Sequence, residues 1–215
     1  SVNYTNMSEA IVQADPQAVN FWTGSCTGSL KTETSLVVAY NNEDGWMKFD
    51  VSMIPEGADI SSIELHGYVN DTYWPYWSIT SLPHDPLSAS AGTIRSWIES
   101  HSGTSEAYYF GNESSSFSTG WHSWSLGNSA NYDLENALTD GWFAVGIDSR
   151  DNDNQYYLIF DGWDETNPPY LVIDYTYTPA FEWLSLDGGS VTSGLISQQD
   201  SMFINAGFDA TGLAE

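Results

Sequence analysis

The chain has 215 residues, of which 41% are hydrophobic and 15% aromatic, a composition typical of a folded domain and not of a disordered segment. Its formal net charge of −25 arises from 29 acidic residues against four basic ones. A surface this negative repels phosphate backbones and anionic lipids, which argues against nucleic-acid or membrane-surface partners. No run approaches the roughly 18 apolar residues of a membrane span, so we expect no membrane insertion.

The single cysteine, Cys26, lies in the small-residue segment TGSCTGS, which we interpret as a loop. One cysteine excludes a disulfide within the chain and a zinc site of paired cysteines. The first 13 residues lack the basic start and apolar core of a signal peptide, and the chain does not begin with Met. We therefore expect a mature or excised piece of a longer protein.

Strand signals dominate the chain. The segment SSIELHGYVN alternates with a period of two: one face carries Ile63, Leu65, Gly67 and Val69, and the other carries Glu64, His66 and Tyr68. The same period returns in GWFAVGI, YYLIF and YLVIDYTY, and clusters of Gly, Asn, Asp, Ser and Pro separate these segments. This pattern predicts an all-β fold, an antiparallel β-sandwich or jelly roll with short helical turns.

The aromatic stretch NDTYWPYWSIT follows the first of these strands and divides into two parts. Alternation in WSIT places Trp77 and Ile79 on one face, so we expect Trp77 to be buried in the core. Trp74, immediately before Pro75, belongs to a turn and is expected to face solvent.

Two segments have helical spacing instead. AGTIRSWIESH places Ile94 and Ile98 four residues apart, and SANYDLENALTDG does the same with Leu134 and Leu138 before a stop at Gly141. We expect short helices at these two places, accommodated at the ends of the sandwich.

The composition changes after YTYTP at 175–179. We therefore predict a β-sandwich over residues 1–178 and a second unit over residues 179–215. At about 36 residues, the second unit is too short to bury its own core without a partner.

Two blocks of the first unit resemble a known family. GWMKFDVSMIPEGADISSIELHGYVND (45–71) and SRDNDNQYYLIFDGWDETNPPYLVIDYTY (149–177) resemble the central and closing patterns of DNRLRE-type modules, which are disaggregatase-related and carbohydrate-binding-module-like. The likeness covers most of residues 9–178. It implies a secreted β-sandwich attached to larger extracellular proteins, with polysaccharide binding in some members.

The C-terminal segment FEWLSLDGGSVTSGLISQQDSMFINAGFDATGLAE resembles the first two thirds of a BACON-like Ig-type repeat. The chain stops at Glu215, before the final strands of that pattern. The resemblance implies an incomplete Ig-like unit, either cut at this point or completed by a strand from another chain, which would also provide a route to a homo-oligomer.

Aromatic side chains with polar neighbours are the candidate binding chemistry. Exposed Trp or Tyr rings can stack on sugars, although most large aromatics of a β-sandwich belong to its core. In GWHSWSL, Trp121 and His122 point to opposite faces, and we expect one member of the pair Trp121 and Trp124 to lie inside. The candidate carbohydrate contacts are Trp74, Tyr76 and His122.

The segment DSRDNDN brings Asp148, Asp151 and Asp153 close together. Carboxylates on a loop are ligands that Ca²⁺ prefers, so these residues are a candidate structural Ca²⁺ site. The spacing is not that of an EF-hand, and loops rich in Asp and Asn are also ordinary solvated turns. Asp161, Asp164 and Glu165 form a second candidate cluster.

No motif indicates catalysis: the four histidines are scattered, and neither HExxH nor GxSxG occurs. We predict a non-catalytic extracellular or cell-surface module of a multidomain bacterial protein that binds polysaccharide or mediates adhesion. The alternative is a structural subunit or spacer of an extracellular assembly or filament. An exposed aromatic groove would distinguish the first function from the second, and an enzyme would require carboxylates converging in a cleft.

Overall fold

The chain divides into two units, Ser1–Thr178 and Pro179–Glu215. The computed structural model describes residues 6–12, 22–33, 36–40, 42–101, 108–112, 118–149, 156–178, 186–187 and 190–191. In the second unit, the described residues form one antiparallel pair, β13 (Leu186–Asp187) with β14 (Ser190–Val191).

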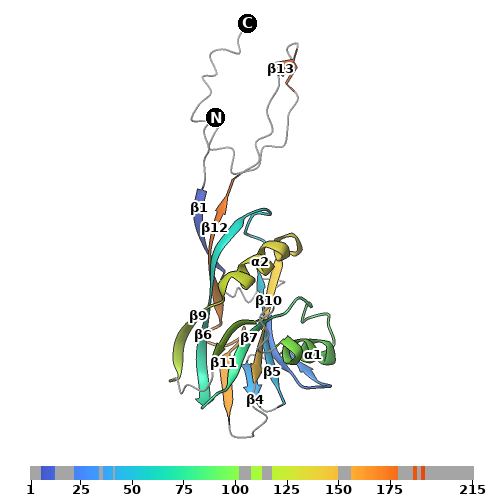
Figure 1. The fold of residues 1–215 in the computed structure, drawn as a ribbon, viewed down its shortest axis with the longest axis vertical. Coiled ribbons are helices and arrows are strands. Elements are labelled where there is room, and N and C mark those ends of the chain that lie inside the picture. Colours follow the sequence, from blue (N-terminus) through green and yellow to red (C-terminus); the bar gives the residue numbers. More distant parts are fainter. Residues whose placement is uncertain are drawn as a thin grey trace. The chain divides into compact units, whose positions relative to one another are not determined.

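The first unit contains two sheets in which the paired strands are antiparallel, so the predicted all-β sandwich is confirmed (Figure 1). The first sheet contains β1 (Asn6–Val12), β12 (Tyr170–Tyr177), β6 (Asp59–Tyr73), β11 (Tyr157–Asp161), β4 (Leu36–Tyr40) and β9 (Gly120–Ser125). The second contains, in spatial order, β3 (Lys31–Thr32), β2 (Trp22–Cys26), β5 (Asp44–Asp50), β10 (Trp142–Ser149), β7 (Trp77–Ser81) and β8 (Tyr108–Asn112).

The 15-residue strand β6 organises the first sheet. One of its edges pairs with β12 and then with β11, while the opposite edge pairs with β9. Between β11 and β12 the chain leaves this edge over residues 162–169 and reaches the second sheet. There the Trp163 backbone N–H donates to Thr23 Oγ1 (2.9 Å), and the Trp163 ring contacts that of Trp22 at 4.2 Å. This excursion therefore ties the two sheets together.

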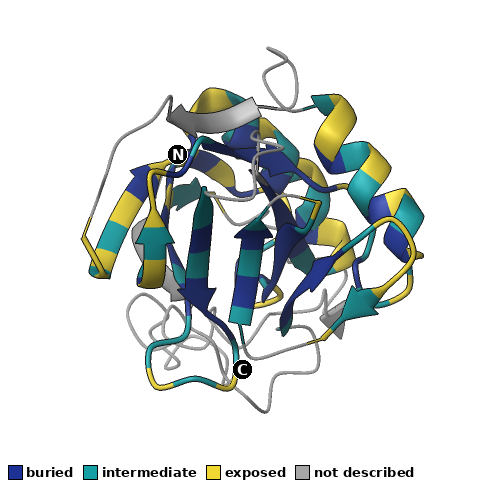
Figure 2. Cartoon of the chain, turned by 90° about the horizontal axis from the view of Figure 1, so that it is seen from below, coloured by how far each residue is buried: buried dark blue, intermediate teal, exposed yellow. Residues whose placement is uncertain are grey.

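The predicted alternation of β6 is confirmed: Ile63, Leu65 and Val69 are buried in the core between the sheets. Figure 2 shows the same banding of buried and more exposed residues along several strands. Gly67 is the small member of this inward row. A Cβ there would lie 3.1 Å from Phe160, so the glycine makes room for an aromatic ring.

Aromatic rings join the two sheets at the centre of the core. Trp77 on β7 is fully buried, as predicted, and its ring meets Trp124 at 5.2 Å and Phe160 at 5.9 Å, both in edge-on geometry. Trp124 and Phe160 also contact each other edge-on at 5.6 Å. Edge-to-face contacts of this kind add to the stability that burial provides.

Both predicted helices are present, but α1 covers the outer face of the second sheet and does not lie at an end of the sandwich. Helix α1 (Ala91–His101) buries Ile94 and Ile98 in a cluster that includes Trp46 and Ala144 of the second sheet. This cluster lies on the face of that sheet opposite the main core.

Helix α2 (Gly127–Ala137) and the 3₁₀ helix η1 (Leu138–Asp140) bury Leu134 and Leu138 in the main core. The turn ends at Gly141, whose φ of 72° is a conformation that glycine adopts readily. Among the described residues, neither helix is long and apolar enough to cross a membrane.

Basic side chains hold the segment before α1 against the second sheet. Lys48 is buried, and its Nζ donates to Asp85 Oδ1 at 2.9 Å. Lys31 Nζ donates to three backbone carbonyls of the same segment, those of Pro86, Leu87 and Ala89. Burial acts to raise the pKa of Asp85, but hydrogen bonds from Lys48 and from the Leu87 N–H outweigh it and hold the pKa below 3.8.

We expect Asp85→Asn to lower the free energy of unfolding by about 3 kcal/mol, because it leaves the buried Lys48 ammonium without its counter-charge. Urea denaturation at pH 7 measures this loss. The difference in the free energy of unfolding between the wild type and Asp85→Asn is complete above about pH 4. It disappears as the pH falls through the lowered pKa of Asp85, because a protonated Asp85 is as neutral as asparagine.

The matched control is Asp59→Asn, which changes an exposed acid at the start of β6 and should alter stability by less than about 0.5 kcal/mol. Equal effects of the two substitutions would contradict the role given to Asp85.

Cys26 is the last residue of β2 and is 1% exposed, so the expectation that it lies in a loop is wrong. The first four residues of TGSCTGS belong to β2 because they pair with β5, where Gly24 lies against the Trp46 ring with no room for a Cβ, and residues 27–29 follow the strand. Burial, reinforced by the charge of Asp44, raises the pKa of the thiol to about 12.

We therefore expect the Cys26 thiol to resist a maleimide or disulfide reagent at pH 8 in the folded protein, because the reactive thiolate is scarce and shielded. Labelling followed by mass spectrometry measures this, with the protein in urea as the positive control. Rapid labelling of the folded chain would show that the position is accessible.

Candidate functional site

Aromatic side chains gather on the outer face of the first sheet. His66 and Tyr68 project there from β6, Trp121 from β9, and Tyr170 from β12; we call these four residues the Trp121 cluster. Strand pairing brings them together, since Tyr68 lies opposite Trp121 and His66 lies opposite Tyr170. Trp121 is 47% exposed, a large fraction for an indole.

Ring contacts hold the Trp121 cluster in place. The His66 and Tyr170 rings stack at 4.6 Å with their planes 9° apart. Trp121 meets Tyr68 at 5.8 Å and Tyr170 at 5.5 Å, with interplanar angles of 80° and 58°. The rings thus stand at different angles and form an uneven aromatic surface. His66 Nε2 also lies 3.2 Å from Glu64 Oε2, which adds a carboxylate to the rim.

The core determines which tryptophan of GWHSWSL faces outwards. Trp124 is 8% exposed and opposes the buried Leu65 across the strand pair, so it points inwards. Residues an odd number of positions apart in a strand point to opposite faces, which places Trp121 on the outside. The prediction that one of the two lies inside is confirmed.

A second aromatic group lies at the other end of β6. It consists of Tyr40, Tyr73, Tyr156 and Tyr157, and we call it the Tyr73 cluster. Tyr73 is half exposed, and its ring lies 6.4 Å from those of both Tyr156 and Tyr157. Tyr157 contacts Tyr40 edge-on at 6.1 Å and donates from its hydroxyl to Asp71 Oδ2 at 3.3 Å.

The three carbohydrate contacts predicted from sequence occupy different settings. Trp74 is 52% exposed in the turn after β6, as expected, and its φ of 41° is unusual for a residue that is not glycine. Tyr76 is half-buried. His122 lies on the inner side of β9, where its ring stacks over Trp124 at 5.9 Å and Nε2 donates to the Ser118 carbonyl at 2.8 Å.

The candidate Ca²⁺ residues are only partly within the described structure. Asp148 is buried near the end of β10, and Ser78 Oγ donates to it at 3.4 Å. Asp151 and Asp153 lie outside the described residues, so the site stays a prediction. Asp161 is buried and accepts from the side chains of Asn70 (2.7 Å) and Asn167 (3.0 Å).

Asp164 is exposed and Glu165 is half-buried in the segment that follows Asp161. In the part of the chain that the structure describes, no group of three or more His, Cys, Asp or Glu side chains is arranged to hold a metal ion.

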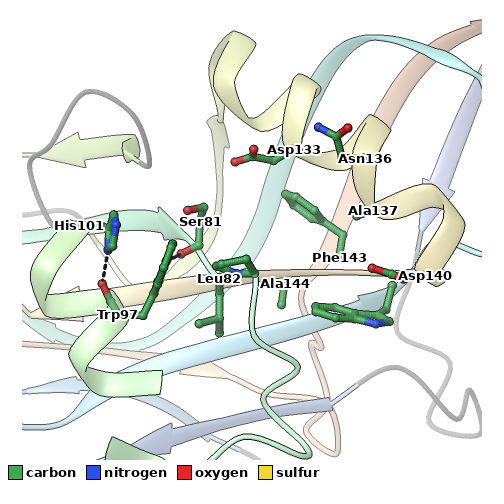
Figure 3. A pocket seen from close by; sticks show the side chains of 12 residues that line it. Ser81, Leu82, Trp97, His101, Asp133, Asn136, Ala137, Asp140, Phe143 and Ala144 are labelled. Carbon is green, nitrogen blue, oxygen red and sulfur yellow. Dashed lines mark hydrogen bonds between the residues drawn. The ribbon is translucent and has the colours of Figure 1, made fainter. Parts of the chain in front are cut away.

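A pocket of about 430 Å³ opens between α1 and α2 (Figure 3). Its lining comprises Ser81, Leu82, Pro83, Trp97, His101, Asp133, Asn136, Ala137, Asp140, Trp142, Phe143 and Ala144. Helix α1 supplies Trp97 and His101, whose rings stack at 3.9 Å. No local motif indicates this pocket, because its walls come from three stretches of the chain, residues 81–83, 97–101 and 133–144.

The pocket carries two carboxylates, the pair of groups that glycoside hydrolysis requires. Asp133 belongs to α2 and Asp140 to η1. Figure 3 shows the two side chains well apart, with Phe143 drawn between them, and not pointing toward a common position. Their arrangement is that of two separate polar groups on the wall of a cavity.

Comparison of the chain with protein-family models finds no match, and comparison with curated proteins finds none either. The DNRLRE-type and BACON-like resemblances stay predictions from the sequence motifs.

Proposed function

We propose that this chain is a non-catalytic carbohydrate-binding module of an extracellular or cell-surface protein, and that it binds a neutral polysaccharide on the outer face of its first sheet. The observation that carries the proposal is the Trp121 cluster, in which the exposed Trp121 ring is backed by three half-buried rings on the outer face of the sheet. The C–H faces of a sugar stack on such rings, while nearby polar groups fix its hydroxyls.

Polar side chains suited to hydroxyl groups surround the rings. Glu64 and His66 form a pair on β6, and Ser123 is exposed opposite His66 on β9. Asp174, on β12, is also exposed and accepts from Ser62 Oγ at 2.7 Å. These groups offer acceptors and hydroxyls on the same face as Trp121.

Charge selects against an acidic glycan. The three basic residues within the described structure, Lys31, Lys48 and Arg95, all belong to the second sheet or its helix and are engaged there with acids or backbone carbonyls. The outer face of the first sheet instead presents Glu64 and Asp71. A uronic acid polymer would meet repulsion here without a compensating cation.

The length of the aromatic face suits a polymer. The Trp121 cluster and the Tyr73 cluster lie on the same face of β6, five to seven residues apart at positions 66, 68 and 73. At about 3.3 Å per residue this is a separation of roughly 17–23 Å, the span of several linked sugar rings. One extended chain lying along β6 could contact both clusters.

We expect Trp121→Ala to weaken binding to a neutral polysaccharide by at least about tenfold, because it removes the most exposed ring of the cluster. A glycan array identifies the ligand, and titration of the variant against that glycan measures the loss. Thermal melting checks that the fold is retained.

Tyr132→Ala is the matched control, since Tyr132 is a 66% exposed aromatic residue on α2 and is not part of either cluster. Trp74→Ala tests the turn residue predicted from sequence in the same assay. Unchanged affinity in Trp121→Ala, or an array with no bound glycan, would contradict the proposal and favour the structural or spacer role.

We also expect a polyuronate such as polygalacturonate not to bind at low ionic strength, where repulsion between like charges is strongest. Affinity electrophoresis in gels containing either this polymer or a neutral glucan compares the two. Stronger retardation by the polyuronate would show that charge is not selecting the ligand.

A further inference from the structure

We infer that the pocket between α1 and α2 is a second binding site, and that its ligand is a small organic ammonium ion with an apolar side. The inference is independent of the proposed polysaccharide site. The Trp121 cluster belongs to the outer face of the first sheet, whereas this pocket is formed by the two helices and by residues of β7 and β10.

The hydrogen-bonding groups of the pocket determine which ligand it suits. Two carboxylates, Asp133 and Asp140, can only accept hydrogen bonds when ionised. Two donors of the lining are used within the protein: Trp97 Nε1 donates to the Ser81 carbonyl at 2.9 Å, and Asn136 Nδ2 donates to the Tyr132 carbonyl at 2.9 Å.

His101 follows the same pattern. Its Nδ1 lies 2.8 Å from the Trp97 carbonyl oxygen, and since a carbonyl only accepts, this nitrogen carries the proton and donates (Figure 3). With these donors used inside the protein, the two carboxylates are the strongest hydrogen-bonding groups that the lining offers to a ligand. A ligand that pairs with these carboxylates brings its own N–H or O–H groups.

Charge decides between an ammonium ion and a neutral or acidic ligand. The described lining contains two acids and no Lys or Arg, within a chain whose net charge is −25. An anion would be repelled, and an alcohol offers a single donor without charge. An ammonium group offers several donors and a positive charge, and charge-assisted hydrogen bonds to carboxylates are the stronger kind.

The apolar part of the ligand has a matching wall. Trp97, Trp142 and Phe143 contribute aromatic rings, and Leu82 adds an aliphatic surface. The indole of Trp142 already holds one ammonium, since Lys48 Nζ lies 5.0 Å from its ring centre while paired with Asp85. Cations are attracted to indole faces in this geometry, and the volume of about 430 Å³ is that of a small-molecule site.

The test compares three probes of one shape: 2-phenylethylammonium, the neutral 2-phenylethanol and the anionic phenylacetate. Two-dimensional NMR of the full chain follows the indole N–H signals during each titration. We expect the ammonium probe to shift the signals of Trp97 and Trp142 and to bind at least tenfold more tightly than the alcohol, with no binding of the anion.

A second comparison identifies the source of the ammonium group. Glucosamine and neutral N-acetylglucosamine are titrated in the same way, and preference for glucosamine over both N-acetylglucosamine and 2-phenylethylammonium would assign the site to amino sugars. Preference for 2-phenylethylammonium would assign it to free amines.

Two variants locate the binding. Asp133→Asn and Asp140→Asn remove one charge each from separate parts of the wall. The substitution that removes the carboxylate paired with the ammonium group should weaken binding of the probe about tenfold, and the other should weaken it less, while Asp59→Asn, at an exposed site outside the lining, should leave it unchanged. Trp121→Ala should also leave it unchanged, which separates this site from the proposed polysaccharide site. Equal binding of alcohol and ammonium, no binding of either, or no effect of both pocket variants would overturn the inference.

Discussion

The packing of Trp124 between the two sheets is the constraint on which the rest of the molecule depends. Its ring fills the core together with Trp77 and Phe160, and Gly67 leaves space for them on the neighbouring strand. Because β9 is extended, this inward position fixes the direction of every other side chain along it. Trp121 is exposed as a direct consequence, so the core and the proposed binding face are two results of one strand register.

Local patterns in the sequence predicted a large part of this arrangement. Alternation placed Ile63 and Leu65 inside, and helical spacing located both helices, because each of these features depends on residues close along the chain. For GWHSWSL the period of two required that one tryptophan be buried. It did not distinguish Trp121 from Trp124, since burying either one satisfies the same alternation. Pairing with β6 resolves the choice by setting Trp124 beside Leu65.

The two proposed binding surfaces could not be predicted from the sequence because they depend on contacts between distant segments. Tyr170 follows Tyr68 by about a hundred residues, and only the pairing of β12 with β6 brings its ring toward Trp121. His122 was a reasonable candidate from composition, yet strand direction turns it toward Trp124. The pocket likewise requires residues of α1, α2 and β10 to line one cavity, an arrangement that no local motif encodes.

The pairing of the basic side chains within the fold has a consequence for proteolysis. Trypsin cleaves only after Lys or Arg, and this chain offers four such positions. Three lie within the described structure: Lys48 is buried in an ion pair, Lys31 is held by backbone carbonyls, and Arg95 is paired with Asp44 and Glu99. A protease binds its target as an extended, accessible segment. The fold therefore protects the chain from cleavage at these three positions.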